Sequence, residues 1–199
     1  MDDNLNFEEE KVLGLRMYFF VPYNISGRQM GIQAGHAALR YARMFSEENR
    51  DVWDFVDNHE TWIILNGGTT NSDRDFDDIS IGSINKIADY LVDKDINFSY
   101  FIEPDLNNAL SAICFLCDER VFNNTDYPNF IDWLLNIKMY DDAKNEAFKN
   151  NPTLWIELKT QTIETLSETF PEYYKEWVRF IGGMKNVYLR EIIKNKKLA

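Results

Sequence analysis

The stretch Gly27–Phe45, GRQMGIQAGHAALRYARMF, decides the fold of this chain. It follows a continuous apolar run, Leu15 to Val21 (LRMYFFV), and the turn-forming residues Pro22-Tyr23-Asn24 separate the two. The apolar run predicts a strand that is buried on both faces. The stretch after it predicts a helix. The chain is therefore expected to begin with a strand, a turn and a helix that packs on the resulting sheet.

Stepping this helix at about 100° per residue separates two faces. One is a polar stripe, within about 40° of Gln29 on either side; its members are Gln29, Gln33, His36, Arg40 and Arg43. The other is a seam of small residues: Gly31, Gly35, Ala38 and Ala42. A glycine inside a helix costs about 1 kcal/mol relative to alanine. We expect the seam to lie close against the sheet, which would explain its two glycines and would leave His36 facing solvent or a cleft.

The polar stripe has two interpretations, and the sequence leaves both open. In the first interpretation, the stripe is an ordinary exposed helix face that carries one histidine and two arginines. Alternatively, it is a partly cationic rim for an anionic ligand, where an imidazole takes a proton or orients water near neutral pH.

Apolar patterns further along the chain predict the rest of a sheet. A second helix is expected to end near Asn58, before a strand at Thr61–Leu65. A helix is predicted for 81–92, where apolar residues recur at helical spacing. Strands predicted for 97–102 and 110–117 flank a turn-forming segment and make a hairpin. This order predicts an α/β fold with a four-stranded mixed sheet and flanking helices.

From Tyr127 onward the apolar spacing is helical. Four helices are expected, at about 127–140, 152–166, 171–180 and 184–198. The chain is thus divided into an acidic N-terminal arm (1–14), an α/β domain (15–124) and a helical extension (125–199). Trp133, Trp155 and Trp177 are expected to pack the extension on the sheet; if exposed, they would instead form an interface.

Composition narrows the class of protein. The net charge of −12 counts against general nucleic-acid binding but does not exclude a local basic surface. The longest apolar runs fall well short of the roughly 18 residues that a membrane span needs, and the acidic N-terminus is unlike a signal peptide. We therefore expect a cytoplasmic protein that does not bind membranes.

Three other features of the sequence have simple structural interpretations. Cys114 and Cys117 lie three apart in a predicted strand, so we expect buried inert thiols rather than a disulfide or a metal pair. The alternating acids at 73–77 resemble the start of a calcium loop but lack its glycine and final glutamate. Gly67-Gly68 could cradle a phosphate but lacks a P-loop's Gly-Lys-Ser/Thr, so a turn is preferred. The sequence predicts no metal and no cofactor.

The C-terminus is locally basic, with the residues Lys185, Arg190, Lys194, Lys196 and Lys197. Cations at a helix end favour the helix dipole. The functional alternative is a contact with tRNA or with a protein partner.

The segment GIQAGHAALRYA, placed after a strand and a loop, resembles the type-2 peptidyl-tRNA hydrolases. That family's helix carries a pattern like K-x-x-x-Q-x-x-H-A, which Gln33, His36 and Ala37 match. The resemblance covers residues 15 to 122 approximately and leaves the helical extension outside. It implies the family's activity, cleavage of the ester between a peptide and tRNA, with no metal or organic cofactor established.

The sequence departs from the family at two places. The family's lysine falls on Gln29, with Arg28 one position earlier, and an arginine cannot tune its pKa as a lysine can. The family's Asp-Ala-Gly-x-Thr segment corresponds to Glu103-Pro104-Asp105-Leu106-Asn107. An acid survives there, either Glu103 or Asp105, but the glycine and threonine do not, and Ser111 is the nearest hydroxyl.

The resemblance implies a role for each matching residue. His36 would activate the attacking water, Glu103 or Asp105 would orient it, and Gln33 would donate a hydrogen bond to the ester carbonyl. The residues expected at the tRNA phosphates are Arg28, Gln29, Arg40 and Arg43.

An alternative function remains open. The protein would be a catalytically degenerate member of the fold, as expected in viral or divergent genomes, that binds RNA or a protein. The acidic charge, the missing lysine and the altered acidic segment favour this alternative. The helical extension would then contact a protein partner, and a homodimer is also compatible with the sequence.

Overall fold

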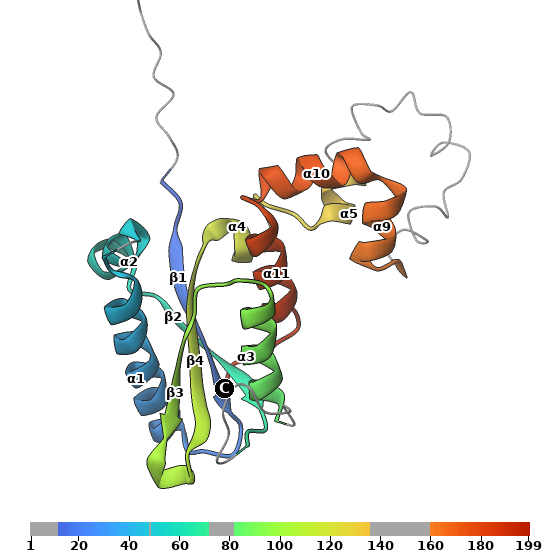
Figure 1. Cartoon of the computed structure of the whole chain (residues 1–199). Helices are drawn as coiled ribbons and strands as arrows, with labels where there is room; N and C mark the ends of the chain where they lie inside the picture. Colours follow the sequence, from blue (N-terminus) through green and yellow to red (C-terminus); the bar gives the residue numbers. More distant parts are fainter. Residues whose placement is uncertain (1–11, 48, 72–81, 136–159) are drawn as a thin grey trace, which may run out of the picture.

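The computed structural model describes residues 12–47, 49–71, 82–135 and 160–199 (Figure 1). In this part of the chain, four strands form a mixed open sheet in the order β2-β1-β4-β3. Their bounds are Leu15–Pro22 (β1), Trp62–Gly68 (β2), Ser99–Glu103 (β3) and Ala109–Asp118 (β4). All four predicted strands therefore form. β2 runs further than predicted, so that Gly67-Gly68 end a strand instead of lying in a separate turn.

The strand directions bring three strand ends together. β1 pairs parallel to β2 and antiparallel to β4, and β3 pairs antiparallel to β4. It follows that β1, β2 and β3 run in one direction and that β4 alone runs against them. The last residues of these three strands, Pro22, Gly68 and Glu103, thus lie along one edge of the sheet, at the bottom in Figure 1. We call it the carboxyl edge; ligand sites of open α/β sheets form there.

Helices cover both faces of the sheet (Figure 1). α1 (Gly27–Phe45) lies on one face, and α3 (Ser83–Asp93) and α11 (Met184–Ile193) lie on the other. The short α2 (Arg50–Asp54) continues as a π-helical turn, η1 (Phe55–His59), where one helix was predicted. Between the layers lies an apolar core that includes the fully buried Phe19, Phe20 and Phe115. The coarse prediction of an α/β fold is confirmed.

The orientation of α1 differs from the prediction. Its buried residues are Gln33, Ala34, Ala37, Ala38 and Tyr41. A Cβ atom added at Gly31 or Gly35 would meet nothing within 4 Å. The prediction that the seam packs closely on the sheet is therefore wrong for its two glycines, whereas Ala38 of the seam is buried. Three alanines and a tyrosine remove more apolar surface from water than glycines would, and this burial decides which face turns inward.

Beyond residue 124 the helices α5 (Phe130–Trp133), α9 (Ile163–Thr169), α10 (Pro171–Phe180) and α11 are described. They build a second hydrophobic cluster in which Trp133 and Trp177 are buried. These tryptophans pack within the extension, not on the sheet as predicted, and Trp155 lies outside the described residues. α11 joins the two parts, because it contributes Val187 to this cluster and Leu189 to the core of the sheet.

The last helix is shorter than predicted. α11 ends at Ile193, and Asn195 follows in the left-handed region with a φ of 61°. An L-residue in this conformation cannot continue a right-handed helix. The chain then turns back so that Leu198 bridges Leu65 of β2. The C-terminal residues thereby lie beside the sheet.

Three further predictions concern the cysteines, membrane spans and the acidic segment. Cys114 and Cys117 are free and buried, as expected, and burial raises the pKa of both thiols. No helix in the described ranges is both long and apolar enough to span a bilayer. The acidic segment 73–77 lies outside the described residues.

Candidate functional site

A hydrogen-bonded network links α1 to the carboxyl edge. Gln33 Nε2 donates to Glu103 Oε2 over 2.6 Å, and Ser111 Oγ donates to Gln33 Oε1 over 2.8 Å. Ser111 Oγ also lies 3.1 Å from the carbonyl oxygen of Phe101. Gln33 is only 4% exposed, and a buried amide needs such partners because leaving it unpaired costs about 1–3 kcal/mol.

Glu103 is the acid that the fold brings to Gln33. It ends β3, and its Oε1 also accepts from the backbone N–H of Asp105 at 3.3 Å. Asp105 lies in the following 3-10 turn, η2 (Pro104–Leu106), and its side chain is exposed. Of the two acids that the sequence left open, Glu103 is the one that contacts Gln33.

His36 lies on the surface beside this network. Its ring stacks on Phe101, with ring centroids 4.3 Å apart and planes inclined by 17°. The Arg40 guanidinium lies over the same phenyl ring, with Cζ 4.7 Å from the centroid. Arg40 Nη1 also donates to the carbonyl oxygen of Tyr100 at 3.1 Å. His36 and Arg40 are one helical turn apart on the same helix face, and the Phe101 ring contacts both side chains.

The exposed side of α1 is locally cationic. Arg28, Arg40 and Arg43 are all exposed, and the helix contains no aspartate or glutamate. Arg40 and Arg43 line a small hollow of about 270 Å³ together with Met44 and Tyr100. We call Arg28, Arg40 and Arg43 the arginine strip. The name refers to the three exposed cationic side chains of α1 taken together.

Gln29 is engaged in starting the helix. Its Oε1 accepts from the backbone N–H of Ser26 at 3.0 Å and from Ser26 Oγ at 2.9 Å. In return, Ser26 Oγ accepts from the backbone N–H of Gln29 at 3.3 Å. This reciprocal pair is a capping box, which stabilises helix N-termini. The predicted role of Gln29 at a phosphate stays a prediction, with its Oε1 engaged in this cap.

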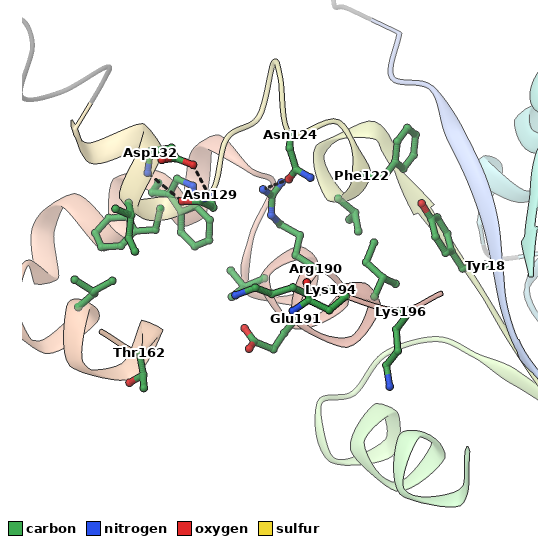
Figure 2. A pocket seen from close by; sticks show the side chains of 18 of the residues that line it. Tyr18, Phe122, Asn124, Asn129, Asp132, Thr162, Arg190, Glu191, Lys194 and Lys196 are labelled. Carbon is green, nitrogen blue, oxygen red and sulfur yellow. Dashed lines mark hydrogen bonds between the residues drawn. The ribbon is translucent and has the colours of Figure 1, made fainter. Parts of the chain in front are cut away.

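A larger cavity of about 1000 Å³ lies between α11 and the other helices of the extension (Figure 2). Among the described residues that line it are Arg190, Lys194 and Lys196, together with the acids Asp132 and Glu191. This described lining contains no histidine or cysteine. It brings charges of both signs together but lacks the histidine that the resemblance assigns as the base, so it is a weaker candidate for ester hydrolysis than the His36 site.

The basic C-terminus is partly engaged in structural contacts. Arg190 Nη1 donates to the carbonyl oxygen of Arg120 at 2.6 Å, and Nη2 donates to Asn124 Oδ1 at 2.8 Å (Figure 2). Burial lowers the pKa of Arg190. Lys185 pairs with Asp95 at 3.0 Å. These contacts of Arg190 and Lys185 favour the interpretation of the basic tail as structural.

Within the described residues, no three His, Cys, Asp or Glu side chains gather where they could hold a metal ion. His59 pairs with Asp54 at 3.3 Å, away from this site. Sequence reasoning missed Phe101, which no motif marks; its only signal is its place in the strand that ends at Glu103.

Comparison with protein-family models, with curated proteins and with solved structures gave no match to this chain. The resemblance to the type-2 peptidyl-tRNA hydrolases therefore rests on the residues quoted from the sequence.

Proposed function

We propose that this protein is a peptidyl-tRNA hydrolase-like enzyme that cleaves the ester between a peptide and tRNA. One observation carries the proposal. Gln33 and Glu103 are 70 residues apart in the chain, yet they are in hydrogen-bond contact at 2.6 Å. The resemblance assigns a glutamine and an acid at these two places to one site, and helical periodicity alone requires no such contact.

The chemistry is addition of water to an ester carbonyl. His36 is exposed at the surface. It takes one proton from the water while the water oxygen bonds to the carbonyl carbon. The bond from that carbon to the ribose oxygen then breaks, and the proton passes to this oxygen, so that tRNA leaves as an alcohol and the peptide as an acid. Glu103 orients the water or the imidazole, and Gln33 holds Glu103 in position.

Gln33 has a different role from the one expected at first. Its amide nitrogen donates to Glu103 and its side chain is 4% exposed, so it is poorly placed to donate to a substrate carbonyl. We assign it as a positioning residue. The arginine strip supplies the attraction for the tRNA phosphates, since neutralising phosphates provides most nucleic-acid affinity.

A second candidate function is an RNA-binding module without catalysis. The specific observation in its favour is the capping box, which occupies Gln29 at the place where the family carries its lysine. The arginine strip would then bind tRNA and no turnover would follow.

Two assays on one purified sample separate these functions. Release of peptide from purified peptidyl-tRNA, above the rate in buffer, supports the hydrolase. Binding of deacylated tRNA without any release supports the module. Neither release nor binding at low salt would remove both proposals.

A further inference from the structure

An apolar groove runs along α1 on the side that faces η1 and β2. It has a volume of about 590 Å³, and its lining includes Ile32, Gly35, His36, Leu39, Val56 and Trp62. Four of its large apolar side chains are unusually exposed: Ile32 50%, Leu39 73%, Val56 44% and Trp62 43%. Exposed apolar side chains gathered in one hollow mark a binding surface.

The small-residue seam of α1 belongs to this groove. Gly35, Ala38 and Ala42 line it, and the space around Gly35 is open, since an added Cβ would meet nothing within 4 Å. A larger side chain at position 35 would enter the groove. The absence of a side chain there thus keeps the hollow open, which explains a helix-interior glycine that packing on the sheet does not.

His36 lies at the boundary between two surfaces of opposite character. It lines the apolar groove, and its ring also stacks on Phe101, which Arg40 covers as well. Among the described residues that line the groove there is no lysine or arginine, and Glu60 is the one carboxylate. The arginine strip lies on the exposed side of the same helix. The imidazole therefore lies where the apolar groove meets the phenyl ring that Arg40 also contacts.

We infer that the apolar groove binds the peptide end of the substrate, by taking up the apolar side chain of the residue esterified to tRNA. This inference rests on the proposed function. Peptidyl-tRNA has the matching polarity, because its ester joins a polyanion to a chain of amino acids. With the phosphates on the arginine strip and the side chain in the groove, the ester would lie at His36.

Two glycines of α1 provide a matched pair of variants. Gly31 and Gly35 are both inside the helix with open space at Cβ, but only Gly35 lines the groove. Gly35→Leu fills the groove, and Gly31→Leu adds the same side chain elsewhere on the helix. Both variants should fold, since leucine favours a helix more than glycine does.

Binding is measured by calorimetry with two non-hydrolysable probes. In each, an N-acetyl amino acid, leucine or glycine, is joined by an amide to the 3′-amino group of a modified adenosine. The wild type should bind the leucyl probe at least about tenfold more tightly, the scale on which apolar pockets discriminate. Gly35→Leu should lose this preference, and Gly31→Leu should keep it within about twofold.

Four results would overturn the inference: equal affinities of the wild type for the two probes, no binding of either, an unchanged preference in Gly35→Leu, or an equal loss in Gly31→Leu. A parallel peptide-release assay on the wild type separates the two proposals. Selective probe binding without peptide release would refute the hydrolase and leave the groove as an apolar acyl site. Peptide release without probe selectivity would refute the groove alone.

Discussion

Gln33 Nε2 donates to Glu103 Oε2 over 2.6 Å, and this contact ties the first helix to the end of the third strand. Ser111 Oγ donates to the oxygen of the same amide at 2.8 Å. Both ends of a buried side chain are thereby satisfied by residues of β3 and β4. The contact fixes the position of the Glu103 carboxylate at the end of β3.

Replacing Gln33 by leucine should destabilise the protein by about 1–2 kcal/mol, because Glu103 and Ser111 each lose a hydrogen-bond partner. The free energy of unfolding from urea titration measures this loss. A double-mutant cycle with Glu103→Ala is the control. The two losses should be less than additive, since both variants break one contact. Full additivity would show that the two residues are not coupled.

Removing the arginine strip should weaken the salt dependence of tRNA binding. Each phosphate contact contributes about 0.7–0.9 to the slope of log affinity against log salt. The triple variant Arg28→Ala, Arg40→Ala, Arg43→Ala should therefore lower the slope by about 2. Arg179→Ala, an exposed arginine of α10, should leave it unchanged. An unaltered slope in the triple variant would place the tRNA elsewhere.

Two glycines should respond in opposite directions to alanine. Gly68 has a φ of 84°, and an added Cβ would lie 2.7 Å from Ser83 Cβ. Gly68→Ala should cost at least about 1–2 kcal/mol, from the left-handed conformation alone. Gly31→Ala, in open space on a helix, should instead stabilise by about 0.4–1 kcal/mol. Thermal unfolding of both variants tests this, and a stabilised Gly68→Ala would contradict the geometry at the end of β2.

The buried thiols should make stability fall at alkaline pH. Burial raises the pKa of Cys114 and Cys117, whereas in the unfolded chain thiols ionise near about pH 8.5. The stability that these groups contribute is fully present below that pH and is lost as the pH rises, because only the unfolded state releases the protons. Urea titrations at pH 7.5 and 9.5 measure the decrease.

The same burial predicts how the thiols react. A thiol reagent at pH 8 should label neither cysteine in the folded protein and both in denaturant. Rapid labelling without denaturant would contradict the burial.

The sequence predicted the sheet better than it predicted the site. Continuous apolar runs mark β1 and β4 because both faces of these strands are buried. The helical wheel separated two faces of α1 but did not identify the inner one, because the buried Ala34, Ala37 and Tyr41 lie between the polar stripe and the seam. From its position on the helical wheel alone, Gln33 would be assigned to the polar surface. That partner is 70 residues away, beyond the range of any periodic pattern.

The capping box of Gln29 shows a different reason why site residues are hard to predict from the sequence. Its signature, Ser26 followed three residues later by glutamine, stands in the sequence and predicts a helix N-terminus. The family's lysine falls at that position, and the resemblance therefore implies a phosphate contact there. Local hydrogen-bonding chemistry explains the residue directly.

The most direct test of the proposed function is the rate of peptide release from peptidyl-tRNA by the wild type and by His36→Ala. Because His36 is exposed, its removal should leave the protein folded. His59→Ala, which changes the chain's other histidine, is the matched control and should retain the wild-type rate. We predict a loss of at least about a hundredfold in His36→Ala, the scale of general acid–base catalysis. An unchanged rate in that variant, or no release by the wild type, would contradict the assignment of His36 as the catalytic base.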